Sequence, residues 1–193
     1  GIGYQAMRNN STGAHNTAIG YEALEGSSGN SHNHNVAIGV EALKALATGG
    51  TNVAIGNYTA RHVSTGTDIV AVGYNALNNA TSATGSIGVG RDAGKGLTTG
   101  TYNIAIGHNA GATNQGQRSV AIGSHCGYSS QSTYCVSIGQ NCAQNGQKTR
   151  SVAIGNYTGE NSQGNYAVAI GSEAGKNSQG NHSIAIGLSL IHI

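Results

Sequence analysis

The chain repeats one short pattern, Val-Ala-Ile-Gly, almost from end to end, and no other feature limits its fold as strongly. We take the glycine that closes each copy as an anchor. Successive anchors lie 17, 19, 17, 17, 17 and 17 residues apart, and then five times 16 residues apart. A short unit repeated at a nearly fixed period indicates stacked units in place of a conventional globular core. The anchors are Gly3, Gly20, Gly39, Gly56, Gly73, Gly90, Gly107, Gly123, Gly139, Gly155, Gly171 and Gly187.

The three residues before each anchor alternate in a way that predicts a β-strand. Branched apolar residues lie one and three positions before the anchor, and a small residue lies between them. Residues two apart share one face of a strand, so we expect the branched residues to fill a core and the small residues to face a neighbouring layer or chain. The expected core residues are Ile38, Ile55, Val72, Ile106, Ile122, Ile154 and Ile170. The expected subunit interface consists of Ala37, Ala54, Ala121 and Ala153.

A second column of small residues lies three positions after each anchor, for example at Ala42 and Ala76. We expect it to mark a second, tightly packed strand, which is also an alternative place for a neighbouring chain. The apolar run at 42–46 could also form a short helix, although the neighbouring repeats argue against this. The anchor glycine suits a corner because it adopts positive φ without a steric penalty. The sequence therefore predicts an all-β fold, a β-solenoid with rungs of 16–19 residues.

Composition limits what this solenoid can do. Only 8% of the residues are charged and the net charge is +2, which does not favour nucleic acid or a membrane surface as a partner. No apolar run reaches the roughly 20 residues of a membrane span, so we expect no membrane insertion within this segment. The first anchor is already at Gly3, from which we expect the chain to begin within a longer array. We predict one domain at residues 1–187 and an atypical tail at 188–193, which could be a cap, an interface or a foreign segment.

The repeat resembles those of two kinds of fibrous protein. Segments of the form Asn/Ser-x-Val-Ala-Ile-Gly-x-x-Ala, such as 35–42, are similar to the head repeats of trimeric autotransporter adhesins and equally to repeats of phage and viral tail fibres. The resemblance implies a left-handed parallel β-roll, a side-by-side homotrimer, and a role in adhesion or fibre building outside the cell, on a cell surface or a virion. The rungs here are longer than the usual adhesin repeat, and we expect neither a coiled-coil stalk nor a membrane anchor within this segment. A cell-surface and a virion-borne fibre therefore both stay open.

One column suggests a ladder of aromatic and cationic side chains. The residues five positions before the later anchors are Tyr102, Arg118, Tyr134, Arg150, Tyr166 and His182. Parallel rungs lie about 4.8 Å apart, so neighbouring Tyr and Arg side chains would lie within cation–π distance. The first interpretation is a packing ladder that stiffens the roll. The second is a glycan-binding stripe, since aromatic faces and Arg donors suit sugars.

Two further columns have a structural interpretation. Four positions before the anchors, Asn and Ser recur, for example at Asn35, Asn52 and Ser119, and we expect them to hydrogen-bond from rung to rung. Cys126 and Cys142 occupy the same small column on adjacent rungs. They could form a disulfide if their geometry allowed it, but the stronger expectation is two free thiols that replace alanine.

The search for catalytic and cofactor motifs predicts no enzyme, no cofactor and no metal site. Segments such as 88–93 fit a dinucleotide-binding pattern only because they contain the repeat corner, and no helix is expected to follow. Three functions are therefore considered. The first is a rigid adhesive fibre segment whose main partner is a copy of itself. The second is a module that binds surface glycans, and the third, least favoured, is an ice-binding solenoid.

Overall fold

The computed structural model describes residues 1–26 and 29–188. Its strands are β1 (Thr17–Ile19), β2 (Val36–Ile38), β3 (Val53–Ile55), β4 (Val70–Val72), β5 (Ile87–Val89), β6 (Ile104–Ile106), β7 (Val120–Ile122), β8 (Val136–Ile138), β9 (Val152–Ile154), β10 (Val168–Ile170) and β11 (Ile184–Ile186). They form one 11-stranded parallel sheet in chain order. Of the predicted tail, residues 189–193 lie outside the described part of the chain.

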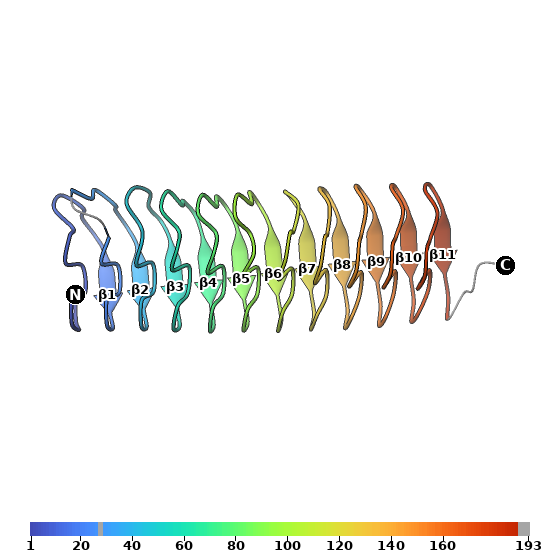
Figure 1. Cartoon of the computed structure of the whole chain (residues 1–193), viewed down its shortest axis with the longest axis horizontal. Coiled ribbons are helices and arrows are strands. Elements are labelled where there is room, and N and C mark those ends of the chain that lie inside the picture. Colours follow the sequence, from blue (N-terminus) through green and yellow to red (C-terminus); the bar gives the residue numbers. More distant parts are fainter. Residues whose placement is uncertain (27–28, 189–193) are drawn as a thin grey trace.

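The chain coils into a β-solenoid, as predicted, and the strands lie side by side along a rod with β1 and β11 towards opposite ends (Figure 1). Equivalent residues of successive repeats pair directly, for example Ala37 with Ala54 and Ala54 with Ala71. With 11 strands, the rod is about 50 Å long at the usual strand spacing. The described residues contain no helix, so the alternative of a helix at 42–46 is wrong.

The anchor glycines form the corner that follows each strand. Gly39 has a φ of 130°, and a Cβ at this position would lie only 2.4 Å from the carbonyl oxygen of Gly56 in the next rung. The same close approach recurs at the other anchors, for example between Gly139 and Gly155. Only glycine satisfies both the backbone conformation and the close stacking, which explains its place in the repeat.

The strands face the opposite way from the sequence prediction. The small residues predicted as a subunit interface, Ala37, Ala54, Ala121 and Ala153, are all 0% exposed and lie inside the coil of a single chain. The branched residues predicted as core point outward: Ile55, Ile106 and Ile170 are 37–39% exposed. Ile38, Val72, Ile122 and Ile154 are half-buried on the same outer face.

The width of the coil explains this inversion. Each strand lies opposite the small column three positions after the anchor, and the side chains of that column are also fully buried, as at Ala42 and Ala76. The space between these two walls is narrow. At Gly88, an added Cβ would lie 3.1 Å from the carbonyl oxygen of Ala93, which belongs to the small column. Branched side chains on both walls would not fit, so alanine faces inward and Val and Ile face outward.

The predicted second strand does not form. The small column lies in a turn, because the residues on both sides of it adopt left-handed backbone conformations. Glu41 has a φ of 54° and Leu43 a φ of 50°, and Ala42 lies between them. Two left-handed residues around a small one reverse the chain direction sharply, which an extended strand cannot do.

Two kinds of core fill the solenoid. In the N-terminal coils, residues 20–106, buried aliphatic side chains occupy the space beside the alanine columns; they are Leu24, Leu43, Leu46, Val63, Ile69, Leu77 and Leu97. In the C-terminal coils, residues 107–187, the same region is filled by the buried glutamines Gln115, Gln131, Gln147, Gln163 and Gln179.

Candidate functional site

The predicted Tyr/Arg column forms a continuous exposed ladder on the C-terminal coils. Its six residues, which we call the Tyr/Arg ladder, are Tyr102, Arg118, Tyr134, Arg150, Tyr166 and His182. All of them have positive φ, between 54° and 62°. This left-handed conformation turns the chain at the corner before each strand.

Each arginine of the ladder lies between two tyrosines. The guanidinium carbon of Arg118 lies 5.8 Å from the ring centroids of both Tyr102 and Tyr134. That of Arg150 lies 5.4 Å from Tyr134 and 5.6 Å from Tyr166. Each arginine also donates a hydrogen bond to the tyrosine hydroxyl of the next rung, at 3.0 Å to Tyr134 and 2.8 Å to Tyr166. The ladder ends in Tyr166 stacked on His182, with centroids 5.1 Å apart.

These contacts affect the two interpretations of the ladder differently. The cation–π stacking expected of a packing ladder is present. A guanidinium covers each face of the Tyr134 ring, since Arg118 and Arg150 come from the rungs on either side. A sugar ring that stacked flat on Tyr134 would have to compete with these two guanidinium groups.

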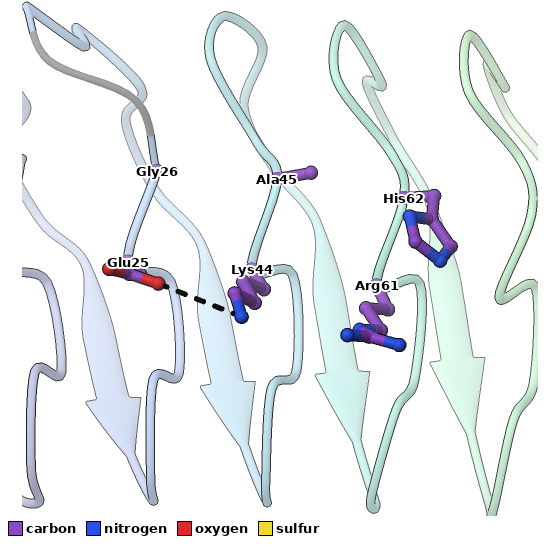
Figure 2. A pocket seen from close by; sticks show the side chains of 6 residues that line it. All are labelled: Glu25, Gly26, Lys44, Ala45, Arg61 and His62. Carbon is purple, nitrogen blue, oxygen red and sulfur yellow. Dashed lines mark ion pairs between the residues drawn. The ribbon is translucent and has the colours of Figure 1, made fainter.

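The N-terminal coils carry a different charged surface, which the sequence analysis did not identify. Glu25, Lys44 and Arg61 line a pocket of about 320 Å³ together with Gly26, Ala45 and His62 (Figure 2). Lys44 Nζ lies 2.5 Å from Glu22 Oε2 and 4.0 Å from Glu25 Oε2, and Arg61 pairs with Glu41. The cations and the carboxylates of this surface neutralise one another.

The ion pairs shift the pKa values of this surface in the expected directions. The hydrogen bond from Lys44 lowers the pKa of Glu22, and the same contact raises the pKa of Lys44. The hydrogen bond with Glu22 also raises the pKa of the Tyr21 hydroxyl. This charged surface could have been predicted from the sequence, because one column five positions after the anchors contains Arg8, Glu25, Lys44 and Arg61.

The expected Asn/Ser ladder is confirmed. Asn35 Oδ1 accepts hydrogen bonds from the backbone N–H and the side-chain amide of Asn52, at 3.1 and 2.9 Å. Asn52 Oδ1 in turn accepts from the backbone N–H of Ile69, and Ser119 Oγ accepts from that of Cys135. This buried column satisfies the backbone where each strand begins, so its role is structural.

The glutamine column is a second buried ladder, which was not predicted from the sequence. The side-chain amide of Gln147 donates to Val136 O, Ser151 O and Gln163 Oε1. Its oxygen accepts from Gln131 at 3.0 Å. The signal for this ladder was a glutamine at every sixteenth position from 115 to 179.

The three cysteines are free and buried, so Cys126 and Cys142 do not form a disulfide in this structure. Cys142 Sγ donates to Ala153 O at 3.0 Å inside the coil. The contact with Cys142, together with burial, raises the pKa of the Cys126 thiol, and burial raises that of Cys135. The Cys126 and Cys135 thiols are therefore poor nucleophiles, and all three buried cysteines pack as small apolar residues.

His32 is another buried group that the sequence analysis did not single out as such. Its side chain is 0% exposed, and neither ring nitrogen has a hydrogen-bond partner among the described residues. Burial lowers the pKa of His32. Most other rungs have glycine or alanine at this position, seven residues before the anchor, so His32 fills space in the longest rung.

Neither a metal centre nor a membrane span emerges from residues 1–26 and 29–188. No three His, Cys, Asp or Glu side chains in these ranges gather as metal ligands. The same ranges hold no helix that is long and apolar enough to cross a membrane.

Comparison with known proteins gives no further guide to function: no family model, no curated protein and no solved structure matches the chain. The surfaces described above are therefore the basis for any functional assignment.

Proposed function

We propose that this chain is a segment of a rigid homo-oligomeric fibre, with three copies packed side by side, that is displayed outside the cell on a cell surface or a virion. The observation that carries the proposal is the outer face of the sheet. Two columns of Val and Ile run along its whole length, and many of these side chains are more than a third exposed, including Ile19, Ile55, Val70, Ile106, Ile138 and Ile170.

The size of this face supports a partner that covers it. Eleven strands at the usual spacing make a stripe about 50 Å long, and two columns of side chains give it an area on the order of 500 Å². This lies in the upper part of the range of about 300 to 600 Å² for the largest apolar patch on a monomeric protein, and such a patch often has a function. With its flanking columns the face approaches the roughly 800 Å² per partner of a stable interface.

The regularity of the face favours a second copy of the chain as that partner. The Val and Ile columns contain no charged residue, and Thr17 is their only polar member. A copy of the same solenoid has the same rung spacing, so its side chains can interdigitate with this face along the whole rod. An unrelated globular partner would match the period over only a few rungs.

The number of copies, the left-handed coil and the location outside the cell rest on the resemblance to adhesin heads and tail fibres. The fold is compatible with these expectations because a stack of short parallel strands makes a rod that resists bending. In this proposal the segment provides length, stiffness and display. The alanine columns have no part in the interface, since they lie inside each coil.

Measurement of the mass in solution tests the proposal. The wild-type chain is expected to have the mass of three copies in light scattering after gel filtration. The double variant Ile55→Lys, Ile138→Lys places two charges on the outer face and is expected to be a folded monomer. Thr65→Lys, at an exposed loop position away from the sheet, is the matched control and should keep the trimeric mass. A wild-type chain that is monomeric, folded and soluble at high concentration would overturn the proposal.

A further inference from the structure

The cationic side chains of this protein fall into two groups. The chain has nine Lys and Arg residues. Six pair with carboxylates: Arg8, Lys44, Arg61, Arg91, Lys95 and Lys176. The other three are Arg118, Lys148 and Arg150, and no carboxylate of the described residues forms an ion pair with them.

The three unpaired cations lie on the C-terminal coils, and two of them belong to the Tyr/Arg ladder. Arg118 and Arg150 belong to the Tyr/Arg ladder, and Lys148 lies two residues before Arg150; all three are exposed. Arg118 and Arg150 are two rungs apart, which is about 10 Å along the rod. Glu160 and Glu173, the two acidic residues of these coils, instead pair with Lys176. The C-terminal coils therefore carry three exposed cations that no carboxylate of the described residues neutralises.

The tyrosines hold the arginines in place without using up their donors. A guanidinium has five N–H groups. Arg118 donates one side-chain hydrogen bond to Tyr134, and Arg150 donates one to Tyr166; within the described residues neither side chain has another acceptor. Stacking between two rings also restricts each arginine, which reduces the entropy that it loses when it binds a ligand.

The geometry points to a linear acidic polysaccharide as the ligand, bound along the rod by Arg118, Arg150 and Lys148. Carboxylate and sulfate groups match the fork of N–H donors on arginine. A sugar unit in an extended chain spans roughly the length of one rung, so a charged group on every second sugar would meet Arg118 and then Arg150.

Two other ligand classes fit these observations less well. A neutral sugar would rely on stacking against the tyrosines, but guanidinium groups cover both faces of the Tyr134 ring. Nucleic acid bases also need an open aromatic face, and a nucleic acid backbone carries charges far more densely than three cations can match. An acidic polysaccharide would bind the side-chain N–H donors of Arg118, Arg150 and Lys148 that have no acceptor among the described residues. This inference does not depend on the fibre proposal.

Calorimetric titration of the wild-type chain tests the inference. The probes are hyaluronan fragments, with one carboxylate on every second sugar, heparin fragments, neutral dextran and a single-stranded DNA oligonucleotide. We expect the two acidic polysaccharides to bind and dextran not to bind. Three contacts should make the affinity fall about tenfold or more when the salt concentration rises from about 50 to about 200 mM.

Variants identify the residues that bind. Arg118→Gln with Arg150→Gln is expected to weaken polysaccharide binding at least tenfold, whereas the pair of Arg→Lys substitutions should keep part of it. Arg61→Gln is the matched control, because Glu41 neutralises that arginine, and its affinity should equal that of the wild type. Since the ladder arginines also stack on tyrosines, Lys148→Gln provides a second test with no ladder contact, and it should weaken binding severalfold without lowering the melting temperature.

Three results would overturn the inference. The first is that neither acidic polysaccharide binds at low salt. The second is that the DNA oligonucleotide binds as tightly as the polysaccharides, which would indicate a nucleic acid surface. The third is that the Arg→Gln pair changes the mass in solution and leaves polysaccharide binding intact, which would place the ladder between copies of the chain.

Discussion

The N-terminal and C-terminal coils build the same sheet around different cores, and the contrast shows what the solenoid requires. In the N-terminal coils, the position four residues after the anchor is often leucine, as at Leu24, Leu43 and Leu77. In the C-terminal coils it is mostly glycine, and an added Cβ at Gly111 would lie 2.5 Å from Gln115 Oε1. Glutamine therefore occupies the space that leucine fills in the other half.

The leucine core and the glutamine core each carry a different energetic penalty. Leu43 and Leu77 both have a φ of 50°, a left-handed conformation that is unfavourable for a residue with a side chain by about 1 kcal/mol or more. Glycine in the C-terminal coils avoids this strain. The glutamines that replace leucine are polar and buried, so they must hydrogen-bond to one another and to the backbone. The rung shortens from 17 to 16 residues where this exchange occurs.

The junction between the two cores lies between Leu97 and Gln115. Gln131, Gln147, Gln163 and Gln179 form a continuous chain of amide hydrogen bonds. The Gln115 side-chain oxygen has no hydrogen-bond partner among the described residues, and neither has that of Gln131. The rung before Gln115 offers a leucine, which cannot donate. The continuous chain of amide hydrogen bonds therefore begins at Gln131, and Gln115 is not linked to it.

The largest effect is expected from breaking the glutamine ladder in its middle. Gln147→Leu removes the amide that links Gln131 to Gln163 and leaves several buried polar groups without a partner. The free energy of unfolding should fall by about 4 kcal/mol, measured by urea denaturation. The matched control is Gln115→Leu, which extends the leucine core by one rung and should cost less than about 1 kcal/mol. Equal costs at the two positions would show that the ladder is not cooperative.

The next largest effect is expected in the aliphatic core. Leu43→Ala removes a fully buried side chain and should lower the free energy of unfolding by about 3 kcal/mol. Hydrogen exchange should locate the loss of protection in the N-terminal coils, because each rung contacts mainly its neighbours. Val40→Ala, at a half-buried corner position of the same rung, should cost less than about 1 kcal/mol. Protection lost evenly along the rod would contradict the division into two cores.

A smaller effect is expected where glycine makes room for glutamine. Gly127 has a φ of 54°, and an added Cβ would lie 2.9 Å from Gln131 Oε1. Gly127→Ala should therefore cost about 1 kcal/mol through backbone strain and the displaced amide. The equivalent position in the next rung already carries Ala143, with a φ of 47°. The reverse change, Ala143→Gly, should be neutral or slightly stabilising. If both substitutions lower the free energy of unfolding, the left-handed backbone conformation does not determine which residue occupies this position of the rung.

Some features of the fold could be predicted from the sequence, and others could not. The period, the anchor corner, the parallel stacking and the Asn/Ser and Tyr/Arg columns all follow from placing equivalent residues above one another. The direction of the strand could not be predicted in the same way. Alternation separates Ala54 from Ile55 but does not say which one faces inward, and that depends on the distance to the opposite wall.

For the candidate site too, the columns could be predicted from the sequence, but the contacts of their side chains could not. The column that contains Tyr134 could be found, but its contacts decide what it can bind, since guanidinium groups cover both faces of the ring. The charged surface around Lys44 was missed because residue type varies along its column. The ladder around Gln147 was missed although glutamine recurs at every sixteenth position, because a polar residue in a turn is expected to face solvent.

The smallest effect concerns pH and the N-terminal coils alone. Burial lowers the pKa of His32, so the unfolded chain binds a proton more readily than the folded one. Stability from this residue is complete above the unfolded pKa of about 6.5 and is lost as the pH falls below it. The described residues place no charged group in contact with the ring, and the exposed His34 stacks on His15 instead.

The melting temperature should thus fall by a few degrees between about pH 7.5 and pH 5. His32→Ala should melt lower throughout but lose this pH dependence, whereas His34→Ala should retain it. If His32→Ala keeps the full pH dependence, the acid sensitivity arises elsewhere in the rod, and the longest rung is no weaker at low pH than its neighbours.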